Sequence, residues 1–259
     1  MRGIINRTGE RNINNFGSEM VIVEYRGALD IDIFFPQYDW TFKNAQYGKF
    51  KKGIIKCPYE PSVYGVGYLG EGKYKASENG KHTRAYKTWN HMLERCYSDK
   101  FHEKQPTYKD CEASEEFYNF QVFAEWFNDN FYQIEGEIMC LDKDILVKDN
   151  KIYSPDTCIF VPQTINSLFV KCDKSRGESV IGTSPLENGK YQVSCNMINP
   201  ETRKFKSEYL GRYDTQEKAF EIYKYYKEKN IKQVADYYKD LIPEKLYNAM
   251  YNYEVEITD

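Results

Sequence analysis

The sequence has few of the residues that most often hold metal ions or act as general bases. It contains 3 histidines, His82, His91 and His102, at irregular spacing. Two histidine ligands on one face of a helix would need the His-x-x-x-His pattern, which is absent. The 7 cysteines include no Cys-x-x-Cys pair, which argues against a zinc site built from thiolates.

The sequence also lacks long apolar runs. No stretch approaches the roughly 18 consecutive apolar residues typical of a membrane-spanning helix. The first residues, Met-Arg-Gly-Ile-Ile-Asn-Arg-Thr, do not contain the apolar core of a signal peptide. We therefore expect a cytoplasmic protein whose cysteines are reduced thiols.

Positive charge is not in excess. The chain has 36 lysines and arginines against 39 aspartates and glutamates, which gives a net charge of -3. No overall positive field would hold such a protein on DNA through the release of counterions, so any DNA contact has to come from a local basic patch. Because dedicated duplex-binding domains usually carry a basic excess, a protein partner stays open as an alternative.

Aromatic residues, in contrast, are abundant: the chain has 24 tyrosines, 15 phenylalanines and 3 tryptophans. Their rings can fill a core, stack on bases or anchor a partner, and composition does not choose among these uses. With 259 residues, 41% hydrophobic and 29% charged, the chain has a globular composition and room for two or three domains. We predict an α+β, multidomain protein.

The N-terminal segment alternates polar and apolar residues as half-buried strands do, over residues 20–25, 29–35 and 40–43. Short strands without an intervening helix predict a small antiparallel β-barrel over residues 1–57. Residues 58–84 follow as a linker rich in glycine and proline. The run Tyr64–Gly72 lacks the Gly-Lys-Ser/Thr ending of a phosphate-binding loop, which favours a linker or a tight hairpin.

The middle of the chain predicts two helices, then two strands and a short helix. Apolar residues at helical spacing mark the first helix at 83–97. The second should begin at Ser114, whose side chain can cap it, and reach about Phe127. Strand patterns follow at 138–141 and 151–161, and Pro162 can begin a short helix.

The last third predicts a small sheet with one packed helix. Its expected strands are residues 179–183, 190–195 and 204–210, with the hairpin motif Asn188-Gly189 between the first two. A long helix should begin at Asp214 or Thr215 and reach about Tyr238. These elements form a unit of residues 173–242, followed by a tail of residues 243–259.

The third of these strands has conflicting alternation. Leu210 should be buried, yet counting back by two puts Lys206 and Lys204 on the same face. A strand cannot bury one of these residues and expose the others without an irregularity. We therefore predict a bulge or an early strand end near Leu210.

Two sequence segments resemble the ββα-metal core of HNH endonucleases. They are Leu141-Asp-Lys-Asp-Ile145 and Asn150-Lys-Ile-Tyr-Ser-Pro-Asp-Thr-Cys-Ile-Phe-Val-Pro-Gln-Thr-Ile-Asn166. The resemblance puts Asp142 at a metal-ligand position and Lys143 where the water-activating histidine belongs. It puts Asn150 in the loop and Asn166 on the helix. An active site of this kind would hold Mg²⁺ or Mn²⁺ through Asp142 and Asn166.

The departure from the HNH pattern falls on the general base. Imidazole titrates near neutral pH, whereas lysine is protonated there, and the neighbouring carboxylates Asp142 and Asp144 favour its ammonium form. Lys143 is therefore a poor base and a reasonable phosphate contact. We predict a degenerate, impaired centre, and a rearranged site that uses His91 or His102 with Asp142 stays open.

A wider stretch resembles phage proteins described as HNH-like. This resemblance is based on three sequence segments: Tyr86-Lys-Thr-Trp-Asn-His-Met-Leu-Glu-Arg-Cys-Tyr97, Phe123-Ala-Glu-Trp126 and Leu141-Asp-Lys-Asp144. They occur in the order found in that group. The resemblance implies an HNH-like domain over residues 85–172.

The C-terminal unit resembles the DNA-binding domain of plant ethylene-response factors. The residues that carry the resemblance are Ile181-Gly182, Lys190-Tyr-Gln-Val193, Leu210-Gly-Arg-Tyr-Asp-Thr215, Glu217, Ala219 and Tyr223. In that family a helix covers one face of the sheet and the other face enters the major groove. The resemblance implies that Gln192 and Ser194 face the bases. It also implies phosphate or base contacts from cations at the strand ends, namely Lys190, Arg203, Lys204, Lys206 and Arg212.

The leading functional hypothesis is a modular, phage-type DNA-binding protein with an inactive HNH-like centre that needs no cofactor. Two alternatives remain open. One is an active metal-dependent endonuclease of the HNH family. The other is a phage-encoded inhibitor that binds a bacterial defence nuclease or another host protein, which near-neutral charge and many tyrosines would suit.

Overall fold

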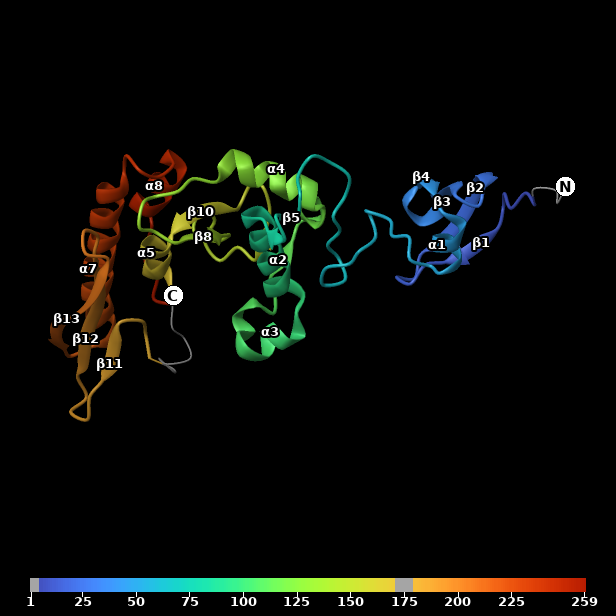
Figure 1. Ribbon diagram of the computed structural model, residues 1–259. Helices are drawn as coiled ribbons and strands as arrows, with labels where there is room; N and C mark the ends of the chain where they lie inside the picture. The colour runs from blue at the N-terminus through green and yellow to red at the C-terminus, as the bar shows by residue number, and fades with distance from the viewer. Residues whose placement is uncertain (1–4, 171–178) are drawn as a thin grey trace. The chain divides into compact units, whose positions relative to one another are not determined.

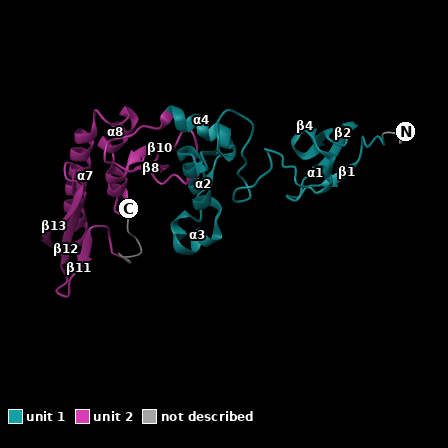
Figure 2. Ribbon diagram, in the orientation of Figure 1, with its two compact units in different colours: residues 1–129 teal, residues 130–259 magenta. Residues whose placement is uncertain are grey.

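The computed structural model describes residues 5–170 and 179–259 (Figure 1). The chain divides into two compact units, residues 1–129 and 130–259 (Figure 2). Both units combine helices with small antiparallel sheets, so the mixed α and β class is confirmed. In the described ranges, no helix has the length and apolar character needed to cross a membrane.

Unit 1 begins with a four-stranded antiparallel sheet in the order β1-β2-β3-β4. Its strands are β1 (Arg11–Ile13), β2 (Glu19–Gly27), β3 (Asp30–Phe35) and β4 (Trp40–Ala45), with a 3₁₀ turn at Pro36–Tyr38. Within the described residues β1 and β4 do not pair, so the predicted barrel is wrong and the sheet is open. Instead, Phe50 of α1 (Tyr47–Lys51) is buried with Ile22 and Ile33, which closes the core without closing the sheet.

The glycine-rich segment after this sheet is packed against the rest of unit 1. Tyr64 and Gly65 both have positive φ in a tight turn closed by hydrogen bonds between Val63 and Gly67. A Cβ at Gly67 would lie 2.4 Å from Leu93 Cδ1, so only glycine allows this close approach. The glycines therefore serve a tight turn and close packing, as the tight-hairpin interpretation predicted. A short hairpin of β5 (Ser77–Glu78) and β6 (Lys81–His82) ends the segment.

The helices of unit 1 follow the predicted pattern in part. α2 (Arg84–Tyr97) is capped by the Thr83 side chain and buries Trp89 and Leu93, as expected. The elements that follow are α3 (Asp99–Lys104), a 3₁₀ turn at Pro106–Tyr108, β7 (Glu112–Ala113), a 3₁₀ helix at Glu115–Tyr118 and α4 (Phe120–Asn130). The single helix predicted from Ser114 is wrong, because the chain is extended at Asn119. This break lets Tyr68 pair with the backbone of Tyr118 and Phe120.

Unit 2 begins with the predicted order of strand, strand and helix. β8 (Met139–Asp142) pairs antiparallel with β10 (Ile159–Pro162), after the short β9 (Ile152–Tyr153). α5 (Gln163–Asn166) follows at once and continues as a 3₁₀ turn at Ser167–Phe169. The strand predicted over residues 151–161 is interrupted, because the chain turns between Tyr153 and Ile159, and the helix is very short. The order of strand before helix holds.

The second part of unit 2 is the predicted three-stranded antiparallel sheet, in the order β11-β12-β13. Its strands are β11 (Thr183–Pro185), β12 (Tyr191–Asn199) and β13 (Lys204–Tyr213). β11 starts later than predicted, because Gly182 has a φ of +73° and a Cβ there would meet the Tyr223 ring. α7 (Gln216–Tyr238) is capped by Thr215, as expected. The predicted tail contains a further helix, α8 (Glu244–Tyr251), which buries Leu246 and Met250.

One hydrophobic core joins the two parts of unit 2. It contains Ile134 and Val161 from the first part together with Ile198, Ile231 and Leu246 from the second. Each fully buried aliphatic side chain contributes about 1.5–3 kcal/mol to folding. The boundary predicted between residues 172 and 173 falls outside the described residues, and the two parts that it was to separate share one core.

We predict that the fragment 130–259 folds alone and that the fragment 173–242 does not. The shorter fragment keeps the sheet and α7 but loses Ile134, Val161 and Leu246 from the core. The check is near-ultraviolet circular dichroism together with thermal unfolding of both fragments. A cooperative melt and a structured aromatic spectrum for the fragment 173–242 would contradict the prediction.

Candidate nucleic-acid interface and the HNH-like loop

Asp142, the predicted metal ligand, caps the turn that leaves β8. Its Oδ1 accepts hydrogen bonds from the backbone N–H of Asp144 at 2.9 Å and of Ile145 at 2.8 Å. Burial raises the pKa of Asp142 to about 6, and the neighbouring Asp144 carboxylate adds to the rise. One of the two carboxylate oxygens is thus committed to holding the turn.

Lys143, which occupies the position of the catalytic histidine, is buried. It is only 6% exposed, and its Nζ donates to Asp144 Oδ2 at 2.9 Å. Its Nζ also lies 5.8 Å from the centre of the Tyr153 ring, within range of a cation–π interaction. A general base has to accept a proton, whereas this amine acts as a donor to a carboxylate.

Asn150 and Asn166 lie in different parts of the predicted motif. Asn150 Nδ2 donates to the backbone oxygens of Lys143 and Ile152, each at 2.7 Å, and so closes the loop. Asn166 is the last residue of α5 and is half-buried. Asp142, Lys143 and Asn150 therefore come together in one loop, where their polar atoms hold the loop's own shape.

This loop is a poor match for a magnesium or manganese centre. Such ions prefer several oxygen ligands, and Asp142 spends one carboxylate oxygen on the turn. Across residues 5–170 and 179–259, no group of three or more histidine, cysteine, aspartate or glutamate side chains could hold a metal ion. The geometry is that of a structural loop.

We predict that Asp142→Asn stabilises the protein at neutral pH. The folded-state pKa of Asp142 is about 6, above its ordinary value of 3.8, so the folded carboxylate becomes costly as the pH rises through that window. Asparagine keeps the Oδ1 acceptor without the charge. Urea unfolding should show a gain of about 1 kcal/mol near pH 7 that disappears near pH 4. A variant less stable than the parent at neutral pH would refute the argument.

The three-stranded sheet of unit 2 has one covered face. Val193 and Cys195 of β12 are fully buried, and they pack in one cluster with Ala219 and the largely buried Tyr223 of α7. Figure 1 shows α7 running along β12 and β13. Side chains that alternate with Val193 and Cys195 therefore leave the sheet on the opposite side, which we call the outer face.

The outer face carries polar side chains, the ring of Tyr209 and an arginine. Cross-strand pairs place the following residues on it: Gln192 with Arg212, Ser194 with Tyr209, and Asn196 with Ser207. The Tyr209 side chain is prominent, because the residue is 59% exposed. Amide, hydroxyl and guanidinium groups on a ribbon of this width can form hydrogen bonds to base edges in a major groove.

The predicted irregularity near Leu210 is confirmed as a β-bulge. Gly211 pairs with Val193, and the next pair is Tyr209 with Ser194, so Leu210 is the extra residue. Gly211 has a φ of +116°, which glycine adopts without strain. The bulge lets Tyr209 and Arg212 share the outer face.

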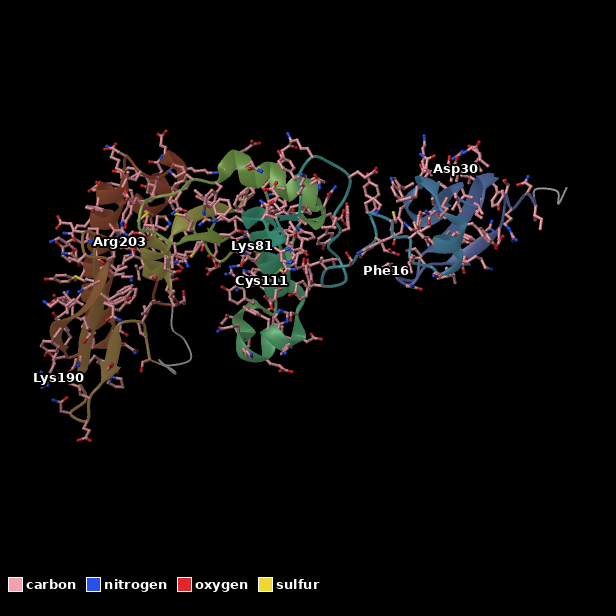
Figure 3. The ribbon with its side chains drawn as sticks, in the orientation of Figure 1. Phe16, Asp30, Lys81, Cys111, Lys190 and Arg203 are labelled. Carbon is pink, nitrogen blue, oxygen red and sulfur yellow. The ribbon has the colours of Figure 1, made fainter. Side chains whose placement is uncertain are left out.

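The predicted phosphate-binding cations lie at different places around the sheet. Lys190 pairs with Asp214 at 2.8 Å and Lys206 pairs with Glu208 at 2.7 Å, all on the surface. Lys204 is also exposed on β13. By alternation, Lys204 and Lys206 leave the edge strand β13 on the other side from Ser207. Figure 3 shows Lys190 and Arg203 at opposite ends of the sheet.

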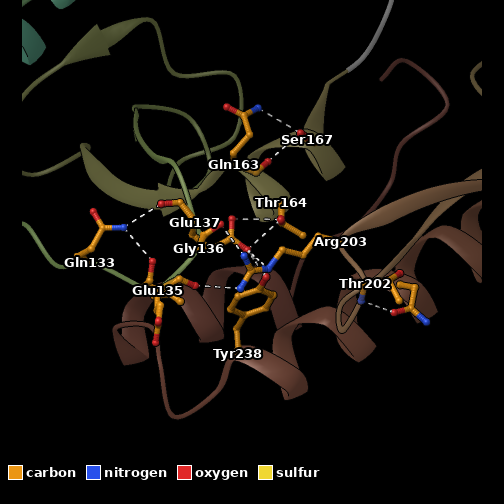
Figure 4. A network of polar contacts seen from close by, with 12 residues as sticks. Gln133, Glu135, Gly136, Glu137, Gln163, Thr164, Ser167, Thr202, Arg203 and Tyr238 are labelled. Carbon is orange, nitrogen blue, oxygen red and sulfur yellow. Dashed lines mark hydrogen bonds and ion pairs between the residues drawn. The ribbon is translucent and has the colours of Figure 1, made fainter.

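Arg203 is engaged inside unit 2 (Figure 4). Its guanidinium donates to the backbone oxygens of Gly136 at 2.5 Å and Glu135 at 3.0 Å. Its Nε lies 3.1 Å from Glu137 Oε1. The five guanidinium donors suit this fork of acceptors, so Arg203 fixes the β12–β13 hairpin to the segment before β8.

Glu137 is the centre of this network, and its side chain is only 2% exposed. Besides Arg203, it accepts hydrogen bonds from Thr164 Oγ1 at 3.0 Å and from Tyr238 OH at 2.5 Å. Burial and the Glu137 carboxylate together raise the pKa of Tyr238 to about 12, so its hydroxyl stays a donor. The carboxylate thus links the β12–β13 hairpin, α5 and the end of α7.

The structure adds three outer-face residues that the sequence interpretation missed: Asn196, Ser207 and Tyr209. Asn196 continues the alternation of Gln192 and Ser194, so a longer second strand would have included it. Tyr209 could not be placed on this face until the position of the bulge was known. Glu137 had no local sequence pattern that marks it as the partner of Arg203.

Comparison of the chain with protein-family models, with curated proteins and with solved structures gave no match. The resemblances to HNH nucleases and to ethylene-response factors therefore remain predictions based on short sequence segments.

We predict that Arg203→Ala lowers the free energy of unfolding by about 2 kcal/mol, because it leaves a buried carboxylate without its cation. Arg203→Lys should recover only part of the loss, since an ammonium cannot reproduce the planar fork. Lys204→Ala is the matched control: it removes the adjacent exposed cation and should change stability by less than about 0.5 kcal/mol. Urea unfolding of the three variants checks this. Equal stability of Arg203→Ala and Lys204→Ala would show that the network contributes little.

Proposed function

We propose that the protein binds duplex DNA through the outer face of the sheet β11–β13. The observation that carries this proposal is a sheet with one face covered by α7 and the other bearing Gln192, Ser194, Tyr209 and Arg212 in register. A two-stranded ribbon fits a major groove, where a glutamine side chain can pair with adenine.

The cations of this unit divide into two groups under the proposal. Arg203 belongs to the fold, because its donors are used by Glu137 and two backbone carbonyls. Lys190 and Lys206 have only surface ion pairs, which are worth at most about 1 kcal/mol and can be exchanged for phosphates. Long lysines on the edge strand can reach a phosphate from either side of the sheet. The proposed phosphate contacts are thus Lys190, Lys204, Lys206 and Arg212.

We propose further that the loop from Asp142 to Asn150, which resembles part of an HNH core in sequence, is structural and has no nuclease activity. The Lys143 ammonium donates a hydrogen bond to Asp144, and the Asp142 carboxylate caps the turn after β8. Nicking of a supercoiled plasmid with Mg²⁺ or Mn²⁺ that Asp142→Asn abolishes would support the alternative of an active endonuclease. In that case the loop would have to rearrange when the metal binds.

The proposal predicts separate effects for two neighbouring residues of the outer face. Arg212→Ala should weaken binding to all duplexes and lower the salt slope by about one, because one counterion fewer is released. Gln192→Ala should change sequence preference by about 1–3 kcal/mol at one base pair with little change in the slope. Mobility shifts of selected and random duplexes over a salt series measure both quantities.

Lys218→Ala is the matched control, because it removes an exposed cation from α7 on the other layer of the same unit. It should bind DNA as the parent does. If Arg212→Ala and Gln192→Ala also bind like the parent, the outer face is not a DNA surface. The hypothesis of an inhibitor that binds a defence nuclease or another host protein would then take its place.

A further inference from the structure

Unit 1 contains a pocket lined mainly by tyrosines. Its volume is about 460 Å³, within the range typical of small-molecule sites. The lining residues, which we call the tyrosine pocket, are Tyr38, Tyr59, Pro61, Val66, Tyr68 and Tyr118. No lysine or arginine is among them.

The walls of the tyrosine pocket are held in place by backbone pairing and ring contacts. Tyr68 N–H donates to the backbone oxygen of Tyr118 at 2.9 Å, and the two hydroxyls of Tyr97 and Tyr118 lie 3.1 Å apart. The rings of Tyr59 and Tyr68 have their centres 6.0 Å apart and are tilted by 53°. The rings are therefore preorganised, which lowers the entropic cost of binding a ligand.

Two carboxylates are linked to these walls by hydrogen bonds, the buried Glu60 and the exposed Glu71. Glu60, 3% exposed, accepts hydrogen bonds from the neutral side chains of Asn14 and Ser18. The Ser18 hydroxyl also lies 3.4 Å from the hydroxyl of Tyr38, a wall residue.

The second carboxylate, Glu71, accepts from Trp40 Nε1 at 2.8 Å and from the hydroxyl of the wall residue Tyr59 at 3.5 Å. In the part of the chain that the structure describes, neither Glu60 nor Glu71 has a lysine, arginine or histidine ion-pair partner. The pocket therefore combines electron-rich ring faces with two carboxylates that have only neutral donors.

This combination selects for positive charge on an apolar body. The face of a tyrosine ring attracts a cation, and the attraction grows when the cation loses water in a pocket. Nearby carboxylates add a negative potential that a concave, low-dielectric wall concentrates. The same potential repels phosphate, whereas pockets for single-stranded nucleic acid place cations beside their rings.

We propose that the tyrosine pocket is a binding site for an organic cation, a methylated ammonium or a guanidinium. A ligand free in solution and a side chain of a partner protein share this chemistry. The site is independent of the DNA-binding proposal, because it uses residues of unit 1 alone.

The test is a titration of the full-length chain with defined probes, and the readout is tryptophan fluorescence. This readout is suitable because the ring centres of Trp40 and Tyr59 are 6.5 Å apart. The cations are choline and N-acetylarginine amide. The controls are 3,3-dimethylbutan-1-ol, a neutral molecule with the shape of choline, and thymidine monophosphate. At least one cation should bind about tenfold more tightly than the neutral alcohol, and added salt should weaken it.

Preference for choline would indicate a small free ligand, and preference for the arginine derivative would indicate a partner side chain. Equal affinity for choline and the neutral alcohol, no binding of either cation, or tighter binding of the nucleotide would overturn the proposal.

Variants separate the contributions of ring and charge. Tyr68→Leu should lose cation binding by about tenfold while Tyr68→Phe keeps most of it, because the ring face is the contact. Glu71→Gln should weaken the cations and leave the neutral alcohol unchanged. Tyr225→Leu, at an exposed tyrosine of α7, is the matched control and should bind as the parent does. If Tyr68→Phe loses as much affinity as Tyr68→Leu with the fold intact, the rings do not recognise the cation.

Discussion

The buried carboxylate of Glu137 is the constraint on which unit 2 depends. An ionised group with 2% exposure costs several kcal/mol of lost hydration, so it has to be surrounded by donors. Those donors are Arg203, Thr164 and Tyr238, and they come from a hairpin, a short helix and the end of a long helix. All three elements have to be in place at once, which fixes the sheet β11–β13 against the segment before β8. The polar network thus specifies an arrangement that the shared hydrophobic core alone would leave less defined.

Local patterns in the sequence were sufficient for much of unit 2. Strand alternation correctly put Gln192 and Ser194 on the opposite face of β12 from Val193. Thr215 was correctly predicted as the residue that caps the start of α7. An irregularity near Leu210, either a bulge or an early strand end, could also be predicted, because burial of that residue conflicted with the parity of its own strand. What could not be predicted was the partner of Arg203, since a salt bridge between distant segments leaves no periodic trace in either of them.

Unit 1 shows where local patterns lose to contacts between distant segments. The apolar spacing after Ser114 is helical, but the chain extends at Asn119 so that Tyr68 can pair with the neighbouring backbone. The strands of the N-terminal sheet were predicted, yet closure into a barrel was wrong because Phe50 of α1 fills the core instead. In both cases the elements follow from sequence and their assembly does not. Gly67 is a further example, because the need for glycine at this position arises from its close contact with Leu93, which is distant in the sequence.

The net charge of -3 sets limits on how the outer face can work. With Arg203 held by Glu137, four cations remain as proposed phosphate contacts, Lys190, Lys204, Lys206 and Arg212. Each phosphate neutralised contributes a slope of about -0.9 to the salt dependence of DNA binding, so the electrostatic contribution is modest. If the outer face binds DNA as proposed, affinity has to come mainly from its contacts to base edges. Such a protein would bind non-specific DNA weakly. Its preference for a target sequence would depend on which side chains the bulge at Leu210 puts on the outer face.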